Sequence, residues 1–161
     1  MFEYADLTAI LPHRHPILQI DRVLELEPGR RIVAAKAVTG AEPCFAGLAE
    51  GLPHSAYAYP AALMVESLGQ AGAALWLLSA RITGETAQGT LVFGAARDFE
   101  FFGAAYPGDV MRHEVVVESL KPSSAVMRGQ TWVGDRRIAS VGSMLAVARP
   151  DTELAGTNPA G

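Results

Sequence analysis

Three polar side chains, Glu66, Ser67 and Gln70, interrupt a long apolar stretch of the sequence, residues 60–78, and Glu66 and Gln70 are four positions apart. In a helix, residues four positions apart lie on the same face, so the carboxyl and the amide are expected to be neighbours. A carboxylate on a helix that is apolar all round is unfavourable unless it is paired, neutralised or used in chemistry. The pattern predicts a proton donor or acceptor in an apolar cleft, oriented by Gln70. A structural carboxylate held by backbone N–H groups is the alternative that the residues leave open.

Three other residues have types that could do chemistry. His13 and His15 have a spacing that occurs in metal sites, but no third ligand cluster accompanies them, so no metal is predicted. Cys44 is the only cysteine, and no motif for a base or an oxyanion site accompanies it. We expect Cys44 to fill space as a small apolar side chain, and its isolation excludes an intramolecular disulfide.

The bulk composition narrows the class of protein. With 161 residues, half of them apolar and 19% charged, the chain is long enough for one compact domain, expected over residues 1–150 with a flexible tail at 151–161. The net charge of -4 and the scattered basic residues argue against a nucleic-acid partner. No secretory signal is visible, and Glu66 within the apolar stretch argues against a membrane span, so a cytoplasmic protein is expected.

The elements that must position Glu66 follow from the hydrophobic pattern and the turn residues. A helix is expected from Pro60 to about Arg81, because proline suits a first helical turn. A long structured loop precedes it over residues 40–60, and such loops are often functional. Alternating apolar residues and turns predict six strands, at residues 17–26, 31–38, 90–102, 109–120, 124–133 and 137–148. The order predicts an α+β fold in which an antiparallel sheet wraps one long helix, with an open sheet edge that favours a dimer.

Four segments resemble, in order, the motifs of one enzyme family. They are LPHRHPILQIDRV at residues 11–23, EPCFAG at 42–47, LMVESLGQAG at 63–72 and YPGD at 106–109. Together they are similar to the bacterial 3-hydroxyacyl-acyl-carrier-protein dehydratases over roughly residues 8–148. The resemblance implies a hotdog fold, in which an antiparallel sheet wraps a long helix, and a dimer with active sites at the interface between subunits.

The resemblance also implies a reaction. A 3-hydroxyacyl chain on the phosphopantetheine arm of an acyl carrier protein loses water and becomes a 2-enoyl thioester, with no other cofactor. A loop histidine of one subunit removes the proton next to the thioester, and a helix carboxylic acid of the other subunit, here Glu66, assists departure of the hydroxyl. Backbone N–H groups of the loop, which includes Gly47 and Gly51, and of the helix start polarise the thioester carbonyl.

The chain departs from the family pattern in this loop. Leu48 stands where the family has its histidine, and the loop is about four residues longer than the family pattern. The added stretch contains His54, twelve residues before Glu66, and Tyr59, which could close over the substrate or simply pack. Either His54 replaces the lost base, or the site lacks a base and His54 is a solvated loop residue.

These observations predict a dehydratase that acts on (3R)-3-hydroxyacyl thioesters in fatty-acid or polyketide chain building. Glu66 is expected as the acid, His54 as the best available base, and Gly47, Gly51, Gln70 and Tyr59 as substrate-binding or supporting residues. Two alternatives stay open. The chain could be a subunit without its own base that pairs with a histidine-bearing homologue, or a thioesterase on the same fold, in which the carboxylate activates water.

Overall fold

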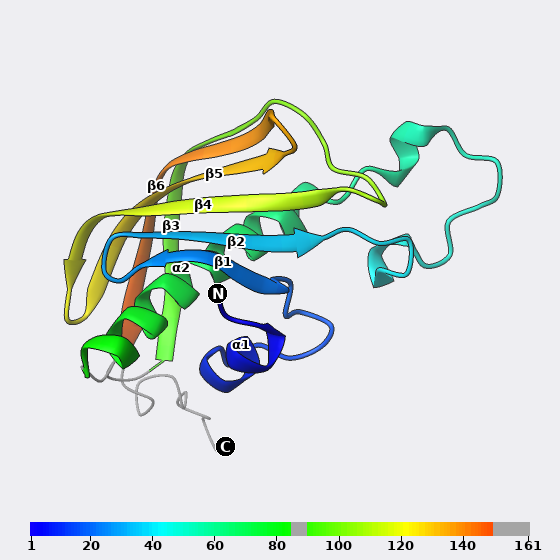
Figure 1. Ribbon diagram of the computed structural model, residues 1–161. Coiled ribbons are helices and arrows are strands. Elements are labelled where there is room, and N and C mark those ends of the chain that lie inside the picture. Colours follow the sequence, from blue (N-terminus) through cyan, green and yellow to red (C-terminus); the bar gives the residue numbers. More distant parts are fainter. Residues whose placement is uncertain (85–89, 150–161) are drawn as a thin grey trace, which may run out of the picture.

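The computed structural model describes residues 1–84 and 90–149, and these contain one sheet of six antiparallel strands. The strands lie in the order β1-β2-β4-β5-β6-β3, and the long helix α2 crosses the concave side of the curved sheet (Figure 1). The α+β hotdog arrangement expected from the sequence is confirmed. The strand bounds are Arg22–Glu27 for β1, Arg31–Ala37 for β2, Thr90–Phe101 for β3, Val110–Lys121 for β4, Ser124–Val133 for β5 and Arg136–Arg149 for β6.

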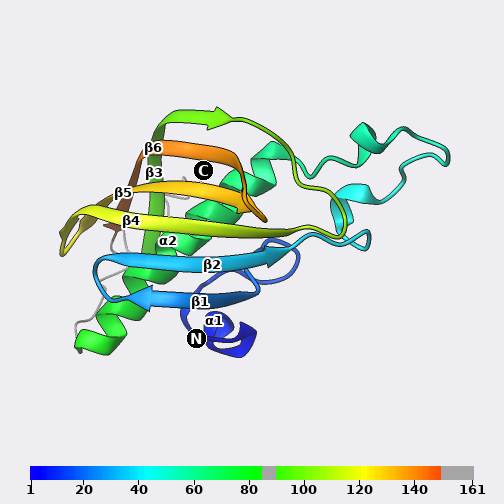
Figure 2. The same ribbon diagram turned by 45° about the horizontal axis from the view of Figure 1, so that its top comes forward.

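The central helix α2 spans Ala61–Thr83, close to the expected range. Pro60 precedes its first turn, and Gly84 ends it in the left-handed conformation, at φ 74°, which suits a residue without a side chain. Figure 2 shows the helix running beneath the sheet. The stretch His54–Thr83, which includes α2, is long and apolar enough to span a membrane. However, 56% of its most apolar 18 residues are buried within the protein, as in the core helix of a globular domain. One stripe, including Glu66, Gly69 and Ala73, stays partly exposed.

The N-terminal segment differs from the expectation. A short helix α1, Tyr4–Ile10, was not predicted; Glu3 and Asp6 cap its first turn and Leu7 packs into the core. The strand expected at residues 17–26 is also corrected, since β1 begins only at Arg22. Of the apolar residues before it, Ile20 is buried, Leu18 is half-buried and Ile17 is exposed. The Ile17 carbonyl and the Gln19 N–H are bound to Gln70 of α2 instead of to a strand.

The loop between β2 and α2 extends away from the sheet (Figure 1). It contains two single-turn helices, η1 at Pro43–Phe45 and η2 at His54–Tyr57. Its first part is attached to the sheet by an ion pair between Lys36 of β2 and Glu42, whose side chains are 7% and 14% exposed. Lys36 also donates a hydrogen bond to the Ala37 carbonyl. This buried pair fixes where the loop leaves the domain.

A buried histidine links the helix to the sheet. His113 of β4 is fully buried; its Nε2 lies 2.8 Å from the Ser67 hydroxyl of α2 and its Nδ1 lies 2.9 Å from the Thr131 hydroxyl of β5. Burial, reinforced by the positive charge of Lys36, lowers the pKa of His113 to about 3. Because Ser67 is fully buried too, this hydroxyl–imidazole pair is a structural bridge.

The shifted pKa of His113 predicts that acid destabilises the fold. The unfolded chain takes up a proton near the ordinary value of 6.5, whereas the folded protein resists it down to about 3. The unfolding equilibrium is therefore expected to shift toward the unfolded state by up to about tenfold for each pH unit as the pH falls through this window. Urea unfolding at several pH values checks this prediction. In His113→Gln the slope of the free energy of unfolding against pH should correspond to about one proton fewer taken up on unfolding. An unchanged slope would exclude His113 as the origin of the acid sensitivity.

Candidate active site

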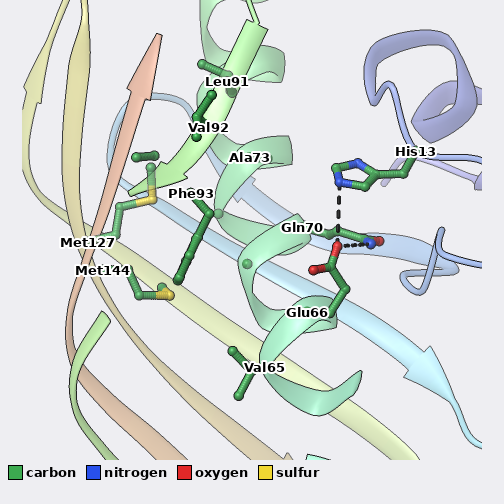
Figure 3. A pocket seen from close by; sticks show the side chains of 13 residues that line it. His13, Val65, Glu66, Gln70, Ala73, Leu91, Val92, Phe93, Met127 and Met144 are labelled. Carbon is green, nitrogen blue, oxygen red and sulfur yellow. Dashed lines mark hydrogen bonds and ion pairs between the residues drawn. The ribbon is translucent and has the colours of Figure 1, made fainter. Parts of the chain in front are cut away.

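Glu66 is held by a neighbour one turn further along α2. Gln70 Nε2 donates a hydrogen bond of 2.7 Å to Glu66 Oε1, as the spacing of four residues predicts. Within the described residues no hydrogen bond or ion pair reaches the other carboxyl oxygen, Oε2. Figure 3 shows Oε2 directed away from Gln70. The carboxyl group thus has one restrained oxygen and one that is free to act, and its side chain is 37% exposed.

The Gln70 amide has a defined orientation. Its Oε1 accepts the backbone N–H of Gln19 at 2.8 Å, and its Nε2 donates to the Ile17 carbonyl at 2.6 Å as well as to Glu66. Since a backbone N–H can only donate and a carbonyl can only accept, the amide cannot be turned over without losing both contacts. Gln70 therefore always presents an N–H donor to Glu66, and the same amide fixes residues 17–19 to the helix.

His13 is the site residue that sequence reasoning missed. Its type could do chemistry, but it was expected to be structural rather than a metal ligand; in the structure its Nε2 lies 3.5 Å from Glu66 Oε1, and its side chain is 27% exposed. The segment carrying it, which follows α1, is placed against α2 by the bonds to Gln70. The contact joins residues 53 positions apart, so no local pattern reveals it. The sequence contains only an indirect indication of this contact. A buried amide such as that of Gln70 needs polar partners from another segment, and the segment that supplies them also carries His13.

A cavity of about 150 Å³ opens beside the carboxyl group. Figure 3 shows His13 and Gln70 on one side of Glu66 and apolar side chains across the cavity on the other. The remaining lining comes from α2, β3, β5 and β6: Val65, Gly69, Gly72, Ala73, Leu91, Val92, Phe93, Met127, Met144 and Ala146. A single carboxyl oxygen at the edge of an apolar space can transfer a proton to or from a bound group that water does not surround.

Tyr59 does not line the cavity. It is 3% exposed, and its hydroxyl donates to Gln19 Oε1 at 2.5 Å. Burial, together with the negative charge of Glu42, raises the pKa of Tyr59. In the single chain this hydroxyl is bound to Gln19, so the residue does not present it to the cavity as the expected substrate contact would require.

The loop residues named from the sequence lie apart from Glu66 within one chain. His54 is exposed, does not line the cavity and stacks on Tyr106, with ring centroids 4.0 Å apart. Gly47 and Gly51 have φ of 77° and 73°, so the loop needs glycine at both turns. Leu48, between them, is 39% exposed. The structure therefore brings together Glu66 and Gln70, but not His54, Gly47 or Gly51.

The remaining candidates do not form a second site. Burial, with the charge of Glu42, raises the pKa of the Cys44 thiol, which makes it a weak nucleophile. Among residues 1–84 and 90–149, no group of three histidine, cysteine, aspartate or glutamate side chains could hold a metal ion.

Comparison with known proteins identifies the family. The FabA-like domain family matches residues 11–142. The 3-hydroxyacyl-acyl-carrier-protein dehydratase FabZ of Symbiobacterium thermophilum is 41% identical over 126 residues, which is 78% of this chain and 83% of the relative. FabZ of Clostridium kluyveri is 36% identical over 86% of this chain and 90% of its own length. A dehydratase heterocomplex, ApeI:P from Xenorhabdus doucetiae, shares the fold, with a TM-score of 0.76 and 14% identity over 92% of this chain and 94% of that one. The chain therefore belongs to the FabA-like family and, within it, to the 3-hydroxyacyl-acyl-carrier-protein dehydratases.

Proposed function

We propose that this protein removes water from (3R)-3-hydroxyacyl thioesters carried by an acyl carrier protein, and so forms 2-enoyl thioesters in fatty-acid or polyketide chain building. Two observations support the proposal. The chain is at least 36% identical to two FabZ dehydratases over most of its length. Glu66 stands at an apolar cavity with one oxygen restrained by Gln70 and the other facing the space where a substrate hydroxyl would lie. The second observation carries the mechanism.

Glu66 is the general acid of the proposed reaction. As a carboxylic acid it donates the proton on Oε2 to the substrate hydroxyl while the bond between that oxygen and the β carbon breaks, and water leaves. A base removes the proton from the α carbon, and the electron pair of that C–H bond forms the new double bond. Transfer of the proton from the base to the carboxylate restores the site. The thioester carbonyl is stabilised by N–H groups near Gly47 and Gly51 and at the start of α2, where no side chain caps the helix.

A dimer completes the site in this proposal. The strand β3 lies at an edge of the sheet, and its Phe93 and Phe101 are exposed in the single chain. An open apolar edge of this kind favours pairing with a second copy. The extended loop then delivers His54 of one protomer as the base for Glu66 of the other, and an acyl carrier protein brings the substrate on its phosphopantetheine arm, without another cofactor, in the cytoplasm.

A second candidate is a subunit of a mixed dimer. Leu48 has no group that can accept a proton, and His54 stacks on Tyr106 outside the cavity of its own chain. A related chain with a loop histidine would then supply the base, while this chain supplies Glu66. The dehydratase ApeI:P, which has a similar fold, is a heterocomplex.

A variant of His54 separates the two candidates. If the homodimer is the enzyme, His54→Ala is expected to lower the turnover of a pantetheine thioester by about 10²- to 10⁴-fold, as for loss of a general base. His15→Ala, an exposed histidine outside the cavity, is the matched control and should keep full turnover. Activity that is unchanged in His54→Ala would exclude this base. Turnover that appears only after a histidine-bearing homologue is added would establish the mixed dimer instead.

A further inference from the structure

Glu66 Oε1 faces two nitrogen-bearing side chains from distant parts of the chain. Gln70 donates to it from the next turn of α2 at 2.7 Å, and His13 Nε2 lies 3.5 Å from the same oxygen. Figure 3 shows both contacts converging on this one oxygen, with the other oxygen directed toward the cavity. The dehydration mechanism uses the Gln70 contact but has no role for His13.

Gln70 determines that Glu66 Oε1 accepts a hydrogen bond. Because its amide oxygen is bound by the Gln19 N–H and its amide nitrogen by the Ile17 carbonyl, Gln70 can only donate toward Glu66. Oε1 must therefore act as an acceptor in both protonation states of the carboxyl group. The proton of the acid form is left with Oε2.

The surroundings of the imidazole favour one arrangement of His13. Its Nδ1 is buried and has no hydrogen-bond partner in the part of the chain that the structure describes. A neutral ring with its proton on Nδ1 would leave a buried donor unpaired and would turn the lone pair of Nε2 toward the lone pairs of Oε1. A proton on Nε2 instead points at Oε1. At 3.5 Å the contact is long, and catalytic hydrogen bonds often shorten when substrate binds.

We infer that His13 is a positioning residue for Glu66: its Nε2–H acts with Gln70 on Oε1, so that the reacting proton is held on Oε2, facing the cavity. This inference rests on the proposed dehydration and deepens it. Two donors that approach from different directions restrict rotation of the carboxyl group, whereas Gln70 alone leaves it able to pivot about one bond. The role also gives a function to a polar ring that has an unpartnered nitrogen and lies beside an apolar cavity.

Two amide variants of His13 test the role. The glutamine amide nitrogen reaches about as far as Nε2, so His13→Gln keeps a donor near Oε1, whereas the shorter asparagine reaches only the position of Nδ1. With the full-length protein and a 3-hydroxybutyryl pantetheine thioester, His13→Gln should keep kcat within about threefold of the wild type. His13→Asn should lower kcat by up to about a hundredfold, with a much smaller change in KM, because the proton is misplaced rather than the substrate lost. Equal effects of the two variants, whether both active or both inactive, would overturn the inference.

A spectroscopic measurement on the wild type does not depend on the variants folding. In protein labelled with ¹⁵N-histidine, the shifts of the His13 ring are expected to report a proton on Nε2; a lone pair on Nε2 would overturn the inference. His15→Asn serves as the matched control for turnover, because His15 is exposed and does not line the cavity. A wild type that turns over no 3-hydroxyacyl thioester, even with a histidine-bearing homologue, would refute the proposed function, while the ring measurement would still decide the orientation of His13.

Discussion

Replacing Glu66 with glutamine is expected to lower dehydration by about 10²- to 10⁴-fold, the usual contribution of a positioned general acid. The amide has nearly the shape of the carboxyl group but cannot release a proton to a leaving hydroxyl. Gln70 would still meet an acceptor, because the Glu66→Gln side chain can present its carbonyl oxygen to the Gln70 N–H. Initial rates of enoyl formation from a 3-hydroxyacyl pantetheine thioester measure the effect.

The control for this variant is another carboxylate that is far from the cavity. Glu118 of β4 forms an ion pair with Arg128, at 3.6 Å, and does not line the cavity, so its Glu118→Gln variant should retain full activity. Circular dichroism and thermal unfolding should be the same for both variants, since Glu66 is partly exposed and its exchange leaves no buried charge unpaired. A folded Glu66→Gln protein with wild-type turnover would contradict the assignment of the acid.

Replacing Lys36 with methionine is expected to destabilise the fold by about 3–5 kcal/mol, the range for breaking a buried ion pair. Methionine matches most of the apolar stem of lysine, but Glu42 would keep a negative charge at a position that is 14% exposed, without its partner. The start of the loop would then detach from β2, and the activity should fall along with the stability. Urea unfolding at a fixed protein concentration measures the change in free energy.

Removing both charges of this pair provides the control. In Lys36→Met/Glu42→Leu no unpaired charge is buried, so most of the lost stability should return, as when buried ion pairs are replaced by apolar residues. A single variant as stable as the wild type would show that the pair contributes little to the fold. A double variant as unstable as the single one would show that packing, rather than charge, is responsible.

The fold was largely predictable because local signals marked its elements. Pro60 and Gly84 delimit α2, and turn residues separate the last four strands, which lie within one or two residues of their expected bounds. The helix α1 was missed because seven residues with one buried side chain, Leu7, show no periodicity. The first strand was predicted to begin too early because the apolar residues before Arg22 look like a strand, although the Ile17 carbonyl and the Gln19 N–H are bound to Gln70 instead of to a neighbouring strand. The expected tail at residues 151–161 lies outside the described residues.

The candidate site was predictable only where it is local. Glu66 and Gln70 are one helical turn apart, so their contact followed from spacing alone. The contact between His13 and Glu66 depends on how the segment before β1 packs on α2, which no short pattern encodes. The role proposed for His54 requires a second protomer, because within one chain this residue stacks on Tyr106 and does not line the cavity. Long-range packing therefore accounts for the contact that the sequence could not predict.

The most direct test of the proposed function is the mass of the product. The purified protein, alone and then with a histidine-bearing homologue, is incubated with a (3R)-3-hydroxyacyl pantetheine thioester and analysed by mass spectrometry. We expect a thioester lighter by one water molecule, and we expect this product to disappear with Glu66→Gln. Release of the free acid and the thiol would instead make the protein a thioesterase, and an unchanged substrate under both conditions would contradict the dehydration proposed here.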